Sequence, residues 1–246
     1  MSETTEPVAS NEPDLAWRLL LAGVAIVLIL VTFAVQATQQ STIPPLVVFA
    51  ALLVIGMVLL VIRPRIGAIT VGVLAVLMVL VNLPFIVSDL PHPESFWSFV
   101  PTAVALIAGL AGAVALVAVL RRAPGGPAGI VGVVAVVALV GAVGIAVVQS
   151  GGQDDDVKQD GDFGMFAQDI EFKPDVLTSP AGDIGIFIGN DDLVRHNFSI
   201  DELDVDEELP SKAYVRIALD DVEPGTYTYY CNIEGHEDMK GTLTVQ

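Results

Sequence analysis

Side chains that bind metal ions lie close together near the end of the chain. Cys231 is followed after four residues by His236 and after two more by Met239, while His196 lies 35 positions before Cys231. A thiolate, a thioether and two imidazoles form a soft, mixed donor set of the kind that suits copper. The sequence therefore predicts one mononuclear copper site per chain, with His196, Cys231, His236 and Met239 as the metal ligands.

The rest of the composition indicates two very different environments. Hydrophobic residues make up 53% of the 246 residues, which is above the usual share for a water-soluble protein. Of the 29 acidic side chains, 23 lie in residues 151–246, together with only 6 of the 11 basic ones. We therefore expect a lipid-embedded half followed by an acidic domain in water, and no nucleic-acid partner, because phosphate binding needs clustered Lys and Arg.

Five apolar runs in the first half have the length of membrane-spanning helices, about 20 residues each. The predicted spans cover residues 15–36, 43–62, 66–87, 97–120 and 127–148. They contain no histidine and almost no ionisable side chain, so neither a haem site nor a proton path is expected inside the bilayer. The sequence predicts an all-α bundle of five transmembrane helices and a lipid bilayer as its partner.

Glycines recur in the last two of these runs, at spacings that would let helix backbones approach closely. Gly109 and Gly112 belong to the fourth run, and Gly129, Gly132, Gly141 and Gly144 to the fifth. We expect these glycines to pack against neighbouring helices of the same chain; the alternative is a face for dimer formation.

The arginines of this half indicate its orientation. With the tail of residues 1–14 in the cytoplasm, all five arginines lie at the inner face, and the outer loops carry no Lys or Arg. These arginines are Arg18, Arg63, Arg65, Arg121 and Arg122. An odd number of spans then delivers the C-terminal domain to the extracytoplasmic face of the cell membrane. His92, in the loop on that same face, is interpreted as a solvated loop histidine.

An acidic, Gly-rich stretch at residues 149–162 is typical of an extended linker. Short strand-like runs separated by Pro and Gly follow it, so residues 163–246 are expected to form an all-β sandwich. The expected strands cover residues 168–172, 183–188, 196–200, 213–219, 226–231 and 241–245.

Several sequence signatures of this second half occur together and in order. They are Phe172-x-Pro174, Ser179-Pro180-Ala181-Gly182, Asn190-Asp191 ahead of His196-Asn197-Phe198, and Pro224-Gly225-Thr226-Tyr227 leading into Tyr230-Cys231. The stretch from about Phe163 to Val245 therefore resembles a cupredoxin, the plastocyanin-like family of blue copper domains with a Greek-key sandwich.

The resemblance implies a role for each candidate residue. His196, Cys231 and His236 would be the equatorial copper ligands and Met239 the long axial one, while the amide of Asn197 would steady the loop that carries the cysteine. It implies an electron carrier, not an enzyme, cycling one copper between Cu(I) and Cu(II) and exchanging single electrons with redox partner proteins. Glu234, Glu237 and Asp238 surround the second histidine, which favours a partner with a basic docking surface.

Two other functions stay open from the sequence. One is a copper-binding, metal-handling module without a carrier role, and the other is a subunit that feeds electrons to a larger membrane redox enzyme. A complete copper enzyme is not expected, because it needs further histidine-rich copper sites and only His92 remains once His196 and His236 are used. The sequence does not indicate an oligomeric state.

Overall fold

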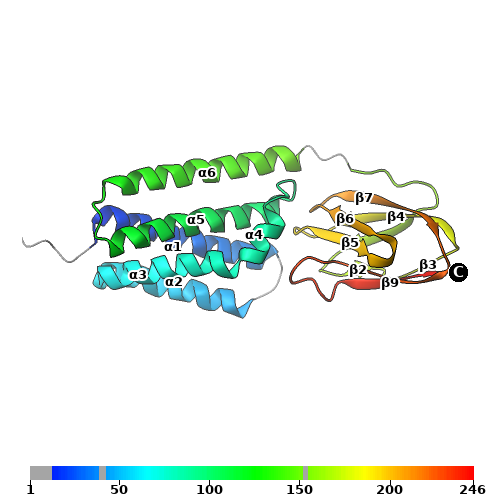
Figure 1. Cartoon of the computed structure of the whole chain (residues 1–246), viewed down its shortest axis with the longest axis horizontal. Coiled ribbons are helices and arrows are strands. Elements are labelled where there is room, and N and C mark those ends of the chain that lie inside the picture. Colours follow the sequence, from blue (N-terminus) through cyan, green and yellow to red (C-terminus); the bar gives the residue numbers. More distant parts are fainter. Residues whose placement is uncertain (1–12, 39–42, 152–154) are drawn as a thin grey trace, which may run out of the picture. The chain divides into compact units, whose positions relative to one another are not determined.

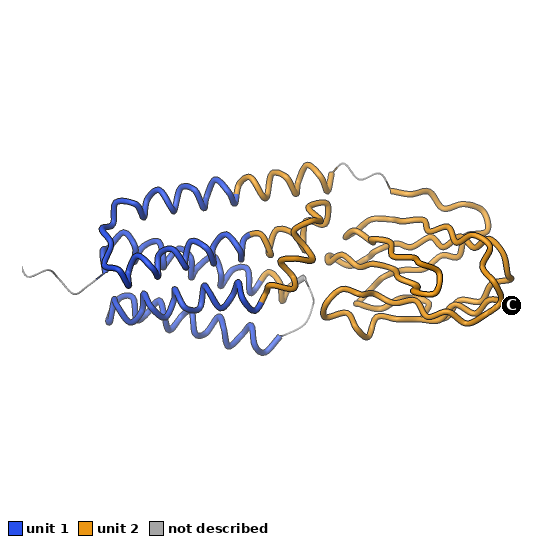
Figure 2. The backbone as a smooth tube through the Cα atoms, viewed as in Figure 1, with its two compact units in different colours: residues 1–33, 42–81, 104–139 blue, residues 34–41, 82–103, 140–246 orange. Residues whose placement is uncertain are grey.

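The computed structural model describes residues 13–38, 43–151 and 155–246. The backbone divides into two compact units, which Figure 2 draws in different colours. The first consists of residues 1–33, 42–81 and 104–139, and the second of residues 34–41, 82–103 and 140–246. Helices come first along the chain and a β-sheet domain follows them, as predicted.

In the described part of the chain, six helices precede the strands, and five of them are long and apolar enough to cross a membrane. The helices are α1 (Leu15–Thr38), α2 (Pro44–Ile62), α3 (Pro64–Val81), α4 (Leu83–Asp89), α5 (Phe96–Leu120) and α6 (Gly126–Ser150). The third predicted span, residues 66–87, is not one helix, because the chain turns at Asn82 and begins α4. Pro84 lies in the first turn of α4, where the missing N–H of proline removes no helical hydrogen bond.

The glycines of the two last long helices differ in their surroundings. A Cβ added at Gly112 of α5 would lie 2.4 Å from the Ala75 Cβ, and one at Gly109 would lie 2.3 Å from a methyl group of Val79. Both glycines therefore let α5 approach α3 closely, as predicted. At Gly129, Gly141 and Gly144 of α6, an added Cβ would meet nothing within 4 Å. The prediction of close packing is wrong for these three, because most of α6 lies exposed along its length.

Two sheets form the domain that follows (Figure 1). One has the order β2-β1-β4-β7 and the other the order β3-β9-β8-β5-β6. The strands are β1 (Phe163–Ala167), β2 (Phe172–Lys173), β3 (Val176–Ser179), β4 (Gly182–Asn190), β5 (His196–Ile200), β6 (Val205–Leu209), β7 (Tyr214–Val222), β8 (Gly225–Tyr230) and β9 (Lys240–Val245). β1 runs parallel to β4 and β3 parallel to β9, while the other pairs are antiparallel.

Alternation of apolar and polar residues explains how the two sheets share a core. In β4, Ile184, Ile186 and Ile188 are buried at every second position, which is the period of a strand with one inward face. From the other sheet, Phe198 and Tyr229 pack their rings with centroids 5.1 Å apart. The sandwich predicted from the strand pattern is confirmed.

The strand predictions contain one error and three omissions. The run at residues 168–172 was expected to be a strand, but residues 168–171 form the turn between β1 and β2, in which Asp169 and Ile170 both have φ of 59°, and only Phe172 lies in a strand. This left-handed backbone is incompatible with an extended strand. The sequence also did not indicate β1, β3 and β6. In β3 and β6 polar residues interrupt the apolar pattern.

Part of the acidic segment before the domain is attached to the edge strand β7. The side chains of Asp155 and Asp156 accept hydrogen bonds from the backbone N–H groups of Tyr214 and Arg216, at 2.9 and 2.8 Å. The backbone N–H of Asp156 also donates to the Tyr214 carbonyl at 3.0 Å. The chain is thus already fixed to the sandwich at residue 155.

Candidate metal centre

The fold brings the candidate ligands to one end of a single sheet. His196 is the first residue of β5, and Cys231 directly follows the last residue of β8. These two strands are neighbours, with Ser199 opposite Tyr230. His236 lies in the loop between Cys231 and β9, so three donors come from adjacent parts of the sheet although 35 residues separate the first two.

The three donor atoms converge on one point. The Nδ1 atoms of His196 and His236 are 3.2 Å apart, and the Sγ of Cys231 lies 3.5 Å from Nδ1 of His236 and 4.0 Å from Nδ1 of His196. With metal–nitrogen and metal–sulfur bonds of about 2.0 and 2.3 Å, two donors on one ion lie at most about 4.0 Å apart for two nitrogens and 4.3 Å for nitrogen and sulfur. All three separations therefore allow one shared ion.

The site is closed to water. His196 is fully buried, Cys231 is 3% exposed and His236 is 5% exposed. Among the residues that the structure describes, these three form the one group of His, Cys, Asp or Glu side chains found close enough together to hold a metal ion. Two nitrogens and a thiolate in a dry site fit copper better than the oxygen-binding cations.

Backbone hydrogen bonds hold the loop from Cys231 to Met239. The Cys231 N–H donates to the Met239 carbonyl at 2.9 Å, and the Met239 N–H donates to the His236 carbonyl at 2.9 Å. Gly235 has φ of +88°, a conformation that favours glycine, and the next N–H, of His236, donates back to Ile233 at 3.0 Å. Met239 is fully buried at the end of this loop. Its role as axial ligand stays a prediction.

Burial shifts the protonation of two donors. It raises the pKa of the Cys231 thiol, although backbone N–H groups of Asn197 and Ile233 that point at the sulfur act in the opposite direction. Burial also lowers the pKa of His236 to about 4, and the neighbouring His196 adds to this shift. His236 is thus neutral at pH 7 with a lone pair available, and metal binding would release the thiol proton of Cys231.

Comparison with known protein families identifies the part of the chain that carries His196, Cys231 and His236. Residues 136–245 match the family described as the cupredoxin-like domain. The C-terminal part of the chain is a cupredoxin-like domain. The match begins inside α6, whereas the first strand begins at Phe163.

Solved structures similar to this domain include an amicyanin, an auracyanin and a cupredoxin. A reduced mutant of amicyanin is 19% identical, and the alignment covers 36% of this chain and 86% of that one, with a TM-score of 0.31. Auracyanin B is 22% identical, with 39% and 96% covered and a TM-score of 0.31. A purple cupredoxin from Nitrosopumilus maritimus is 23% identical, with 35% and 100% covered and a TM-score of 0.29. A search of curated proteins found no match to the chain.

A carboxylate orients the first histidine of the cupredoxin-like domain. The Oδ2 of Asp192 lies 2.9 Å from Nε2 of His196 and also accepts the backbone N–H of Ile170, while Oδ1 accepts the N–H of Asp169. Burial acts to raise the pKa of Asp192, but these three hydrogen bonds outweigh it and lower the pKa to about 2. An ionised Asp192 keeps the proton of His196 on Nε2 and leaves Nδ1 free to bind a metal.

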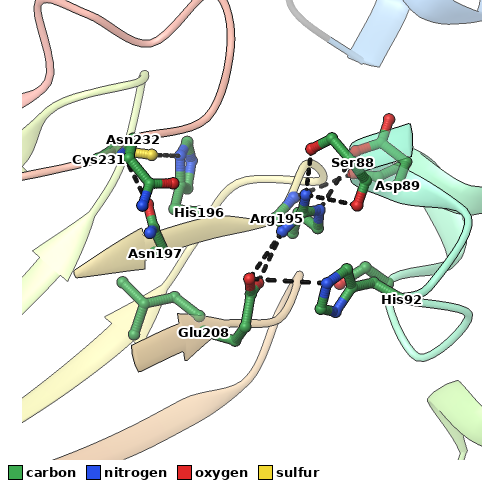
Figure 3. A network of polar contacts seen from close by, with 12 residues as sticks. Ser88, Asp89, His92, Arg195, His196, Asn197, Glu208, Cys231 and Asn232 are labelled. Atoms are coloured by element: carbon green, nitrogen blue, oxygen red, sulfur yellow. Dashed lines mark hydrogen bonds and ion pairs between the residues drawn. The ribbon is translucent and has the colours of Figure 1, made fainter. Parts of the chain in front are cut away.

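A second polar group holds the cysteine end of the site. The Oδ1 of Asn197 accepts the backbone N–H of Asn232, the residue after Cys231, at 2.8 Å, as Figure 3 shows. The Nδ2 of Asn197 in turn donates to Asp206 at 2.5 Å, and Ser199 donates to the same oxygen at 2.7 Å. This contact of Asn197 is of the kind that the resemblance implies.

The sequence did not reveal two of these contributors, Asp192 and Asp206. Both belong to a chain rich in acidic groups, and nothing in their spacing marks them out. Asp192 lies four residues before His196, and in a loop this separation does not predict a contact. The contact depends on the turn at Asp169 and Ile170, whose backbone N–H groups hold the Asp192 carboxylate in place. His92, expected to be solvated, instead contacts Glu94 at 2.9 Å and Glu208 at 3.7 Å.

Proposed function

We propose that this protein is a membrane-anchored blue copper protein that transfers single electrons. The observation that carries the proposal is the convergence of Nδ1 of His196, Nδ1 of His236 and Sγ of Cys231 in a buried site of a cupredoxin-like domain. Copper, when bound, supplies a one-electron couple between Cu(I) and Cu(II).

The residues of the chain favour a carrier over an exchangeable metal-binding module. His196 is held by Asp192, and the loop of Cys231 is held by Asn197, so two ligands are fixed before any ion arrives. A fixed, dry donor set keeps the change of geometry between two oxidation states small. Handling of metal ions requires donors that a passing ion can reach, and His196, Cys231 and His236 are buried.

We further propose that the helices span the cell membrane five times, with the N-terminus in the cytoplasm and the copper domain outside. Five helices have the required length and hydropathy, and the arginines lie at the ends that would face the cytoplasm. The lipid-facing character of the helices is supported by large exposed apolar side chains, such as Val61, Leu110 and Val133.

The redox partner is proposed to be a protein with a basic docking surface. Glu234, Glu237 and Asp238 are all exposed on the loop that carries His236. Opposite charge on a partner would accelerate the encounter at low ionic strength. The same surface would serve if the chain feeds electrons to a larger membrane enzyme.

Titration of the full-length protein with Cu(II) in detergent tests the proposal. We expect an intense visible absorption band and a paramagnetic signal at one copper per chain, and their loss in Cys231→Ser. Met239→Leu should keep the colour and change the reduction potential if Met239 is the axial ligand. Wild-type protein that stays colourless, or a Cys231→Ser variant with the same spectra, would refute the copper assignment.

A further inference from the structure

The side chain of Arg195, directly before the proposed ligand His196, has a partner for every one of its donors (Figure 3). Its Nε donates to Asp89 at 3.2 Å, and one terminal nitrogen donates to both carboxylate oxygens of Glu208, at 3.0 and 2.8 Å. The other terminal nitrogen donates to the carbonyl of Ser88 at 2.8 Å and to the hydroxyl of the same residue. Arg195 is only 4% exposed.

These partners come from two distant parts of the sequence. Glu208 belongs to β6 of the cupredoxin-like domain, opposite Asn197. Ser88 and Asp89 lie at the end of α4, 107 and 106 residues before Arg195. A buried guanidinium is costly unless its donors are satisfied, and Glu208 alone satisfies only one of the three nitrogens. All three nitrogens of the Arg195 guanidinium are therefore hydrogen-bonded only when Ser88 and Asp89 at the end of α4 are in place.

Backbone groups of the copper domain make further contacts with the same segment. The N–H of Arg195 donates to the hydroxyl of Ser98 at 3.1 Å, and the N–H of Ser211 donates to that of Ser95 at 3.3 Å. Asp89 is itself held by Thr102, whose hydroxyl donates to it at 3.1 Å. The contacts with the domain thus extend from Ser88 to Ser98, and Thr102 supports Asp89 within the same stretch.

This stretch has apolar support of its own. Phe99 and Ala103 of α5 are buried together with Ala146 of α6. Leu90, Phe96, Val100 and Ala142 pack against them. Ser88 and Asp89, which accept the hydrogen bonds of Arg195, therefore lie next to packed ends of α5 and α6 within the second compact unit.

We propose that the stretch from Ser88 to Thr102 is a docking site for the cupredoxin-like domain of the same chain, with Arg195 as the residue that locks it. The surface on the domain consists of Arg195, Glu208 and Ser211. Arg195 directly precedes His196 in the sequence. The end of the domain that docks is therefore the end that carries the proposed metal ligands. That this end holds copper rests on the proposed function, but the dock itself does not.

The dock changes how the domain is attached to the helices. The linker alone would tether a domain that samples many orientations. The dock fixes the domain relative to α4 and the start of α5, which belong to the same compact unit. Three proposed spans precede α4 and five precede the domain, so both docked parts lie on the same side of the proposed membrane. It also indicates a role for the helices beyond anchoring, since α4 and the start of α5 form the receiving surface.

Distance measurement between two spin labels tests the dock without copper. In a full-length Cys231→Ser background reconstituted in nanodiscs, labels are attached at Pro91→Cys and Glu223→Cys, both exposed positions, one on each side of the dock. We expect a single narrow distance distribution with Arg195 and Asp89 present. Arg195→Gln and Asp89→Asn should each broaden the distribution several-fold. The double variant should be no broader than Arg195→Gln alone, because Asp89 then has no contact with Arg195 left to lose.

Arg216→Gln is the matched control. Arg216 also donates two hydrogen bonds to a carboxylate, that of Asp162, at 2.9 Å each, but this pair lies within the domain. In Arg216→Gln the distribution of distances between the two spin labels should stay narrow. Asp89→Asn leaves the domain untouched, so its broadening cannot arise from unfolding of the sandwich. A broad distribution in the unaltered background, or a narrow one in both Arg195→Gln and Asp89→Asn, would overturn the proposal, whereas the copper assignment would be unaffected.

Discussion

The cupredoxin-like domain and the long helices fix their side chains by different means. Around His196 and Cys231, positions are set by hydrogen bonds to a few carboxylates and amides, as with the three N–H groups that Asp192 accepts. Between α3 and α5, positions are set by shape, as where Gly112 leaves room for Ala75. The proposed surroundings give the reason. In the lipid bilayer that we propose for the helices, apolar side chains gain little by leaving lipid, so helices associate through close packing. In water, burial is favourable by itself, and polar contacts then select one geometry.

The largest effect is expected where shape alone decides. Gly112→Leu should destabilise the helices by about 3 kcal/mol, because overpacked sites force side chains and backbone apart, and an added Cβ already lies 2.4 Å from the Ala75 Cβ. Thermal unfolding in detergent, followed by helix content, measures the loss. Gly141→Leu is the control, since nothing lies within 4 Å of that site. Equal stability of the two variants would contradict the difference we describe between α5 and α6.

Asp192→Asn tests whether a polar contact is decisive in the domain. An amide has one accepting oxygen, and its NH₂ group would face backbone N–H groups that the carboxylate accepts. We expect copper affinity to fall by about 10- to 100-fold, the usual effect of removing a group that orients a metal-binding histidine. Competition titration with a chelator measures it. Asp191→Asn removes the same charge one residue away and should bind copper like the wild type; a loss there as well would point to net charge instead of orientation.

Asp206→Ala should have a smaller effect, on stability more than on copper. It removes the acceptor of Asn197 and Ser199 near the surface, so we expect a loss of about 1 kcal/mol of domain stability. Chemical unfolding of the copper-free protein gives this value. A loss of copper affinity larger than that of Asp192→Asn would show that the cysteine loop, not the histidine, is the part most dependent on its support.

The pH dependence of Asp192 is expected to be the smallest effect. Its pKa in the folded protein is about 2, below the usual 3.8, so the ionised form stabilises the fold. This contribution, about 1 kcal/mol after allowance for partial exposure, is fully present above pH 5 and is lost as the pH falls toward 2. The stability difference between copper-free wild type and Asp192→Asn should therefore shrink below pH 4. A difference that stays constant down to pH 2 would mean that Asp192 is not ionised through its contacts.

The sequence was sufficient where a physical pattern repeats over many residues. Five long apolar runs predicted five helices long enough to span a membrane, and alternating strands predicted the sandwich. It was insufficient for short features. The break at Asn82 and the turn at Asp169 and Ile170 each depend on a few residues whose neighbours decide the backbone.

The sequence by itself determined the donor types, because only one cysteine and three histidines are available in the chain. Only the tertiary structure decided that Nδ1 of His196 comes within 3.2 Å of Nδ1 of His236, which requires β5 and β8 to be neighbours. It also decided which acidic groups matter, since 29 of them look alike in sequence and Asp192 and Asp89 are selected by their contacts. Hydrophobic periodicity is a local property of the chain, whereas a hydrogen bond across 106 residues depends on how the whole unit folds.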